Sequence, residues 1–141
     1  MAADIRLEVA TPSRHVLSEA VDEVVVPGAD GYFGVWPGHA PLLALLGVGE
    51  LSYRVGRQER HLAIAGGFAE VGPSHVTILA DTAERPAEID SARARAARTR
   101  AEGRLGGRPG SPGEETDFPR ATTALQRAQA RLQVAARAPG A

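Results

Sequence analysis

Hydrophobic and polar residues alternate along the first part of the chain. The alternation is clearest in residues 5–9 and 51–55 and continues in 61–65 and 75–79, whereas residues 21–26 form a run rich in β-branched valine. Turns rich in glycine and proline, among them Gly66-Gly67, separate these segments. A period of two residues is typical of half-buried β-strands. Many short strands at intervals of about 8–12 residues predict an all-β N-terminal sandwich or flattened barrel. We expect about ten short strands over residues 1–86.

The pattern becomes helical after Ala87. Residues 88–105 contain no proline and are dominated by alanine and arginine, which are both good helix formers. A second helical segment begins near Pro119 and ends before Pro139. Residues 87–141 are therefore predicted to form a C-terminal two-helix antiparallel hairpin, with a flexible linker at residues 106–118.

The apolar face of this predicted hairpin consists mainly of alanine. In the second helix the helical period aligns one stripe, Ala121, Leu125, Ala128, Leu132 and Ala135. Each buried methyl group stabilises a packed helix by only ~0.8 kcal/mol, and isolated helices of this length are marginal in water. We expect either a movable hairpin that packs weakly on the sandwich or on itself, or a solvated helical tail.

Composition excludes several classes of site. The chain has no cysteine and no lysine, so a disulfide framework, thiolate chemistry and a lysine-dependent phosphate loop are all excluded. Its four histidines lack a metal-binding spacing and no serine lies in a nucleophile motif, so we predict neither a catalytic nor a metal site. Aromatic residues make up only 4% and do not interleave with the arginines, which argues against nucleic-acid binding.

Charge divides the chain at the same place as the hydrophobic pattern. Residues 1–85 carry six arginines against eleven acidic residues, whereas residues 86–141 carry ten arginines against six. The basic half suits an acidic protein surface or a phosphate group. No secretory signal and no apolar run long enough to cross a bilayer is visible, so we expect a soluble or peripheral protein.

One glycine-rich segment is specific enough to indicate a family. Residues 31–43 read Gly-Tyr-Phe-Gly-Val-Trp-Pro-Gly-His-Ala-Pro-Leu-Leu. This segment resembles the signature of the epsilon subunit of the F-type ATP synthase, the same family as the mitochondrial delta subunit. The resemblance continues through residues 65–71 and 83–90 and covers essentially the whole chain apart from residues 106–118.

The resemblance implies a non-catalytic rotor subunit that couples proton translocation to ATP synthesis and requires no cofactor. Its expected partners are the gamma subunit and the c-ring, joined by the alpha and beta subunits when the hairpin extends and inhibits ATP hydrolysis. Its expected location is peripheral, on the cytoplasmic face of the bacterial inner membrane. The residues indicated for the gamma and c-ring interface are Asp30, Gly31, Tyr32, Phe33 and His39.

A second motif within the resemblance concerns nucleotide binding. Residues 89–94 match the IDxxRA motif of epsilon subunits that bind ATP in the folded-down hairpin. By this resemblance, the candidate ATP-binding residues are Glu84, Ile89, Asp90, Arg93, Ala94, Arg100, Arg127 and Arg131. Guanidinium groups on two helices suit phosphates because each donates two parallel hydrogen bonds. The alternative is that these charges serve only the helix terminus and salt bridges within the hairpin.

Two other classes of function remain open at this point. A stand-alone β-sandwich adaptor would have the same fold without synthase partners. A soluble nucleotide sensor would bind ATP without binding the gamma subunit.

Overall fold

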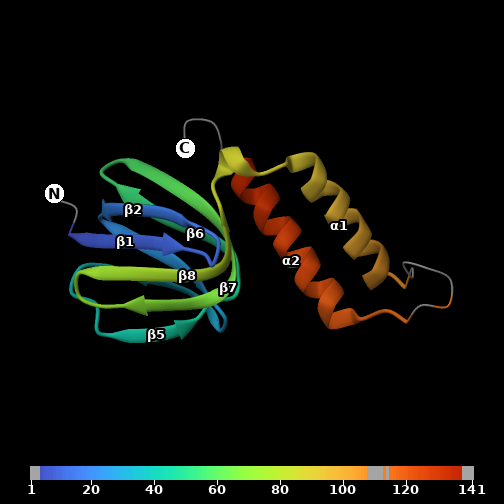
Figure 1. Cartoon of the computed structure of the whole chain (residues 1–141), viewed down its shortest axis with the longest axis horizontal. Coiled ribbons are helices and arrows are strands. Elements are labelled where there is room, and N and C mark those ends of the chain that lie inside the picture. Colours follow the sequence, from blue (N-terminus) through green and yellow to red (C-terminus); the bar gives the residue numbers. More distant parts are fainter. Residues whose placement is uncertain (1–3, 108–112, 114, 138–141) are drawn as a thin grey trace.

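The chain forms a folded β-sheet followed by two helices, of which the second lies against the sheet (Figure 1). The computed structural model describes residues 4–107, 113 and 115–137. Its eight strands are β1 Ile5–Ala10, β2 His15–Val21, β3 Glu23–Gly28, β4 Gly31–Val35, β5 Leu42–Leu45, β6 Val48–Val55, β7 Gln58–Val71 and β8 His75–Glu84. They are followed by a short 3-10 turn, η1 Pro86–Glu88, and by helices α1 Ser91–Leu105 and α2 Phe118–Ala135.

All eight strands belong to one sheet that curls over on itself. Its order is β2-β1-β8-β7-β6-β3-β4, and β5 also pairs with β7. Paired strands are antiparallel except β1 and β8, which run parallel. The predicted β-sandwich followed by a two-helix hairpin is therefore confirmed.

Strand β7 continues through two glycines at which the sequence pattern predicts a turn. On one edge it pairs with β6 as far as Ala65 and with β5 from Phe68 onward. Between these partners, Gly66 and Gly67 have φ angles of 68° and 104°. Glycine adopts such angles without a steric penalty and commonly marks a tight bend in a strand. Because the chain bends here without ending the strand, two of the expected strands form one, and the described residues form eight strands where about ten were expected.

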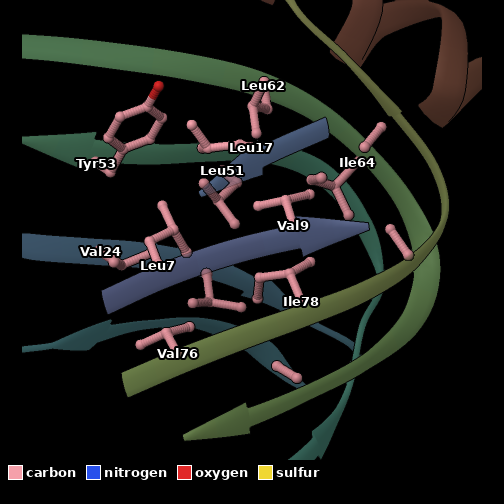
Figure 2. Packing of buried hydrophobic residues seen from close by; sticks show 14 of the residues in the cluster. Leu7, Val9, Leu17, Val24, Leu51, Tyr53, Leu62, Ile64, Val76 and Ile78 are labelled. Carbon is pink, nitrogen blue, oxygen red and sulfur yellow. The ribbon is translucent and has the colours of Figure 1, made fainter. Parts of the chain in front are cut away.

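The core lies between the two layers of the curled sheet and is almost entirely aliphatic (Figure 2). Inward positions of β1 show the period of two directly, because Ile5, Leu7 and Val9 are at most 1% exposed. Tyr53 on β6 is the aromatic residue that is buried among them. This alternation is the signal that made the strands predictable from sequence.

Helix α2 lies between the sandwich and α1, and it packs against β6 and β7 (Figure 1). It therefore has two contact faces where the sequence predicted one stripe. Leu125 and Leu132 of that stripe are only half-buried, whereas Ala130 and Val134 on the second face are buried. The hairpin is thus docked on the sandwich, which contradicts the alternative of a solvated tail.

Two ion pairs, one from α2 and one from the residues directly after it, join the hairpin to the sandwich. Arg131 Nε lies 2.6 Å from Glu84 Oε1, and Arg137 Nη2 lies 3.0 Å from Glu50 Oε1. The apolar part of the hairpin is small because its buried residues are five alanines and one valine, namely Ala94, Ala101, Ala121, Ala128, Ala130 and Val134. Such a surface stabilises docking only modestly.

Both helices begin at an aspartate that caps the first turn. Asp90 Oδ1 accepts from the Arg93 amide at 3.0 Å, and Asp117 Oδ1 accepts from the Arg120 amide at 3.1 Å. The first helix begins at Ser91 and not at the expected residue 88, because Pro86–Glu88 form the separate turn η1. The expected linker at 106–118 falls partly on residues 108–112 and 114, and Pro139 also lies outside the described residues.

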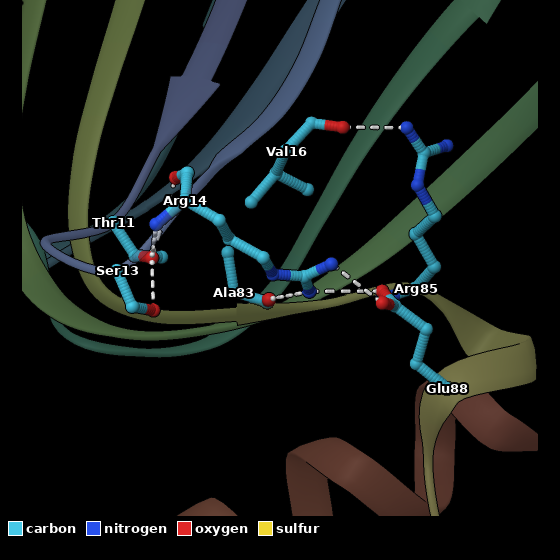
Figure 3. Close-up of polar contacts among 7 residues, drawn as sticks. All are labelled: Thr11, Ser13, Arg14, Val16, Ala83, Arg85 and Glu88. Atoms are coloured by element: carbon cyan, nitrogen blue, oxygen red, sulfur yellow. Dashed lines mark hydrogen bonds and ion pairs between the residues drawn. The ribbon is translucent and has the colours of Figure 1, made fainter.

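Residues 85–88, here called the strap, connect β8 to the hairpin and are held on the sandwich (Figure 3). Arg14, in the turn between β1 and β2, makes a bidentate contact with Glu88, with Nη1–Oε2 at 2.6 Å and Nη2–Oε1 at 3.0 Å. Its Nη2 also donates to the carbonyl oxygen of Ala83 at 3.0 Å. Arg85 Nη2 donates to the carbonyl oxygen of Val16 at 2.6 Å, and the Arg85 amide donates to Glu88 Oε1 at 2.8 Å.

This contact shifts the titration of both partners. The hydrogen bonds from Arg14, with a smaller one from the Arg85 amide, hold the pKa of Glu88 below its ordinary value of 4.5. In return, the hydrogen bond to Glu88 raises the pKa of Arg14.

A first prediction concerns the bend in β7. A Cβ at Gly67 would collide with the carbonyl oxygen of Leu79 and lie 2.7 Å from the Cα of Ala80, and φ is unfavourable as well. Steric strain of about 1–2 kcal/mol and overpacking of about 1–3 kcal/mol add, so Gly67→Ala should lower the free energy of unfolding by about 3 kcal/mol in urea denaturation. The matched control is Gly56→Ala, with φ 62° in open space, which should cost only about 1–2 kcal/mol. Equal losses at the two positions would contradict this reasoning.

A second prediction concerns pH. Because the pKa of Glu88 is lowered by folding, the unfolded chain binds a proton more readily, and stability rises with pH across this interval. The contribution of the ionised Glu88 to the free energy of unfolding is thus present above pH 4.5 and is lost as the pH falls through the lowered pKa. Urea denaturation at several pH values should show wild type more stable than Glu88→Gln at neutral pH, with the gap closing in acid. Glu102→Gln, at an exposed site on α1, should show no such gap, and a gap that does not change with pH would refute the assignment.

Candidate functional site

A cleft of about 360 Å³ opens between the strap and the two helices. It is lined by Glu84, Glu88, Asp90, Arg93, Ala94, Ala97, Arg100 and Arg131. Six of the eight residues that the sequence indicated for ATP binding are among them: Glu84, Asp90, Arg93, Ala94, Arg100 and Arg131. The volume lies within the range of about 300–1,000 Å³ that is usual for small-molecule sites.

Three arginines reach this cleft from both helices. Arg93 and Arg100 are seven residues apart, which places them two turns apart on one face of α1. Arg131 comes from α2, on the opposite wall. The convergence follows from the docking of α2 between α1 and the sandwich, which brings the basic faces of the two helices together.

The three acidic residues of the cleft are already engaged. Glu84 pairs with Arg131, Glu88 is held by Arg14, and Asp90 caps α1. Within the described chain, the guanidinium groups of Arg93 and Arg100 make no ion pair with a carboxylate. Because Asp90 keeps its negative charge while it caps α1, the lining residues outside the two ion pairs carry one net positive charge, which favours an anionic ligand.

Two of the predicted residues lie outside this cleft. Arg127 lines a neighbouring hollow of about 350 Å³ between α2 and the sandwich, which it shares with Arg131. Ile89 is half-buried, and its amide donates to the carbonyl oxygen of Pro86 at 3.3 Å, which closes the turn η1. Arg127 thus approaches from the far side of Arg131, and Ile89 links the strap to α1.

Two cleft residues were missed by the sequence analysis. Ala97 lies between Arg93 and Arg100 on one helix face, so the helical period does place it at this wall. Glu88 lies at the rim, held there by Arg14. No sequence signal links Arg14 to Glu88, because the two are 74 residues apart and meet only through the parallel pairing of β1 with β8.

The residues indicated for the rotor interface lie around the turn between β3 and β4. Asp30, Gly31 and Tyr32 are exposed, and Gly31 has a φ of 132°. The Tyr32 hydroxyl accepts from the amide of Glu50 at 3.0 Å, which holds this ring on the surface. Phe33 packs partly against the core, so its ring supports the turn.

His39 lies apart from the turn between β3 and β4. It is half-buried between β4 and β5, with Nδ1 donating to the carbonyl oxygen of Ala40 at 2.6 Å. The structure therefore brings four of the five indicated residues together and leaves His39 in the next connection along the chain.

A row of exposed apolar side chains crosses β5, β7 and β8 on the outer face of the sheet. Leu45 lies opposite Phe68, and Phe68 lies opposite Leu79, so all three project from the same face. They are 59%, 51% and 55% exposed. Leu43, two residues along β5 from Leu45, extends the row and is also exposed. Contiguous exposed apolar surface of this kind is typical of interaction sites.

This apolar row was not predicted, although the sequence contains a hint of it. The four consecutive apolar residues Leu42–Leu45 leave one side of a strand apolar toward solvent. The partners Phe68 and Leu79 could not be found without the strand register. The row adjoins the turn between β3 and β4, because the Ala29 amide donates to the carbonyl oxygen of Leu45 at 2.8 Å.

Other site types are not found in the described part of the chain. Residues 4–107, 113 and 115–137 contain no group of three histidine or acidic side chains that could hold a metal ion. Neither described helix is long and apolar enough to span a membrane.

Two family models together match nearly the whole chain. Residues 4–86 match the β-sandwich domain of the ATP synthase delta/epsilon chain, and residues 87–136 match the long α-helix domain of the same chain. The boundary between the two matches falls within the strap.

Individual proteins show the same similarity. The chain is 56% identical to the ATP synthase epsilon chain of Syntrophobacter fumaroxidans, covering 96% of this chain and 98% of that protein. It is 50% identical to the epsilon chain of Solibacter usitatus, covering 96% and 98%.

Among solved structures, it matches a chain of the Euglena gracilis mitochondrial ATP synthase, described as OSCP/F1/c-ring, with a TM-score of 0.77 and 25% identity, covering 95% of this chain and 82% of that one. The relatives' name agrees with the expected role as a non-catalytic subunit. The chain belongs to the delta/epsilon chain family of the ATP synthase.

Proposed function

We propose that this protein is the epsilon subunit in the central rotor of a bacterial, proton-translocating ATP synthase, on the cytoplasmic face of the inner membrane. There it couples the c-ring and the gamma subunit to the catalytic head. Support comes from the epsilon-chain relatives and from the Euglena structure, which contains the c-ring.

The sandwich is proposed to bind the rotor through the apolar row and the adjoining turn. Leu45, Phe68 and Leu79 supply an aliphatic and aromatic surface that suits the gamma subunit, because partly exposed aromatic and aliphatic groups anchor protein interfaces. Asp30 and Tyr32, exposed beside this row, face the c-ring in the proposal. Both surfaces lie on the sandwich, so the hairpin is not needed for this assembly.

The hairpin is proposed to be a regulatory element with a docked and an extended state. Its docking depends on a small, alanine-rich contact and on the ion pairs Arg131–Glu84 and Arg137–Glu50, both of which are partly exposed. Partly exposed ion pairs contribute little stability. When the hairpin extends, its arginines would meet acidic surfaces of the alpha and beta subunits and inhibit ATP hydrolysis.

Nucleotide binding would favour the docked state. The observation that carries this proposal is the cleft in which Arg93 and Arg100 of α1 face Arg131 of α2. A ligand with several phosphates that bridges both helices binds only when they are docked, so ATP would shift the equilibrium toward the docked hairpin. ATP acts here as a regulatory ligand and is not consumed.

Calorimetric titration of ATP into the full chain tests this site. We expect saturable binding to wild type and at least tenfold weaker binding to Arg93→Ala, because one charge-assisted hydrogen bond contributes about 1.5–3 kcal/mol. The matched control is Arg95→Ala, which removes an exposed arginine from the same helix outside the cleft and should leave affinity unchanged. If wild type shows no heat of binding at millimolar ATP, the proposed nucleotide site is refuted. The rotor role would be unaffected.

Reconstitution with the gamma subunit and the c-ring tests the apolar row. Phe68→Ser should weaken assembly by about thirtyfold, because truncating a central aromatic anchor costs roughly 2 kcal/mol. Phe118→Ser is the control, since Phe118 is equally exposed but begins α2. Equal effects of the two substitutions would place the interface elsewhere.

The same two experiments separate the rival functions. A stand-alone adaptor would fail to assemble with the gamma subunit and c-ring even as wild type. A soluble nucleotide sensor would bind ATP and also fail to assemble.

A further inference from the structure

The strap is fastened to the sandwich by contacts that do not involve the helices. Arg14 binds Glu88 with both terminal nitrogens, and Arg85 binds the Val16 carbonyl oxygen from the other side (Figure 3). Both partners on the sandwich, Arg14 and Val16, belong to the β1–β2 hairpin. Among the described residues, no side-chain hydrogen bond joins the strap to α1 or α2.

The helices have their own, separate fastenings. Arg131 reaches Glu84 at the end of β8, and Arg137 reaches Glu50 on β6. Arg131 lies in α2 and Arg137 directly follows it, and both contacts end on the sandwich, so neither passes through the strap. Helix α2 also packs against η1, but within the described chain no side-chain hydrogen bond joins the two. The hairpin can therefore leave the sandwich while the contacts of Arg14 and Arg85 stay in place, and breaking those contacts leaves both ion pairs intact.

Two extended residues separate these two sets of contacts. Ile89 has φ −85° and ψ 125°, and Asp90 has φ −81° and ψ 97°, whereas helical geometry begins at Ser91. The Asp90 carboxylate is committed to the first turn of α1 by its bond to the Arg93 amide. The link between the strap and α1 is thus short and changes direction at these two residues.

We propose that Arg14 is a positioning residue that makes the strap part of the sandwich, so that the hairpin pivots at Ile89 and Asp90. Every residue up to Glu88 then stays in place when α1 and α2 move. A second consequence follows for the cleft. The Glu88 carboxylate stays bound to Arg14 at the rim and does not compete with a phosphate for Arg93 and Arg100. The contact between Arg14 and Glu88 is here called the clasp. The importance of the pivot rests on the proposed release of the hairpin, whereas the clasp itself can be tested without nucleotide.

Backbone 15N relaxation on the full chain, without ligand, tests the clasp. In wild type the amides of Ala87 and Glu88 should have order parameters near the rigid value of about 0.85. In Arg14→Ala they should fall below about 0.6, while the strands keep their values. The matched control is Arg6→Ala, an arginine on β1 that contacts Ser18 Oγ at 2.7 Å and does not touch the strap.

A second arm tests where the pivot lies. Arg131→Ala combined with Arg137→Ala removes both ion pairs that join the C-terminal end of the hairpin to the sandwich and should loosen the helices while Ala87 and Glu88 stay rigid. The proposal fails if this double variant loosens the strap as much as the helices, or if Arg14→Ala leaves the strap as ordered as in wild type. Glu88→Ala removes the same contact from the other side and should reproduce Arg14→Ala, which guards against a folding defect at residue 14.

The proposed ATP site and the proposed clasp are tested independently of each other. An absence of ATP binding to wild type would refute the ATP site and would not alter the order of the strap. A flexible strap in wild type would refute the clasp and would not alter the ATP titration.

Discussion

Strand β7 can serve both layers of the sandwich because it bends at Gly66 and Gly67. Before the bend, Ala63 and Ala65 form the floor on which α2 rests. After the bend, Phe68 lies at the centre of the outer apolar row. One pair of glycines therefore sets the relative position of the two surfaces through which this protein is proposed to work. A side chain at Gly67 would push β7 away from β8 and would move both surfaces at once.

The two parts of the molecule are stabilised by different physical means. The sandwich has a contiguous aliphatic core, which resists local opening because all its members are packed together. The hairpin buries mainly alanine and depends on a few partly exposed ion pairs, so its docking free energy is small. A small docking free energy is what a regulatory element requires, because a ligand can shift an equilibrium only by its difference in affinity for the two states.

The sequence predicts the fold well because its strands and helices follow clear periods. The alternation in β1 and the composition change after Ala87 are both local signals. Arg93 and Arg100 share a helix face by spacing alone, and the motif around them led to most of the cleft. Ala97 was missed although the helical period places it, whereas the other missed features depend on contacts between residues far apart in the sequence. Phe68 and Leu79 meet through strand register.

Arg14 is the clearest case of a residue beyond the reach of local patterns. It lies in an ordinary turn between two strands, and nothing near it in sequence indicates an acidic partner. Its role depends on the position of the strap, which is set by the pairing of the last strand with the first.

That parallel pairing of β1 with β8 also has a consequence for the order of events during synthesis. The first strand to leave the ribosome can form a hairpin with β2 at once, but its other edge must wait until about 70 further residues have emerged. The sandwich therefore closes late, only a few residues before the helices are made. Throughout this interval the open edge of β1 presents unpaired backbone groups with which another strand can pair wrongly.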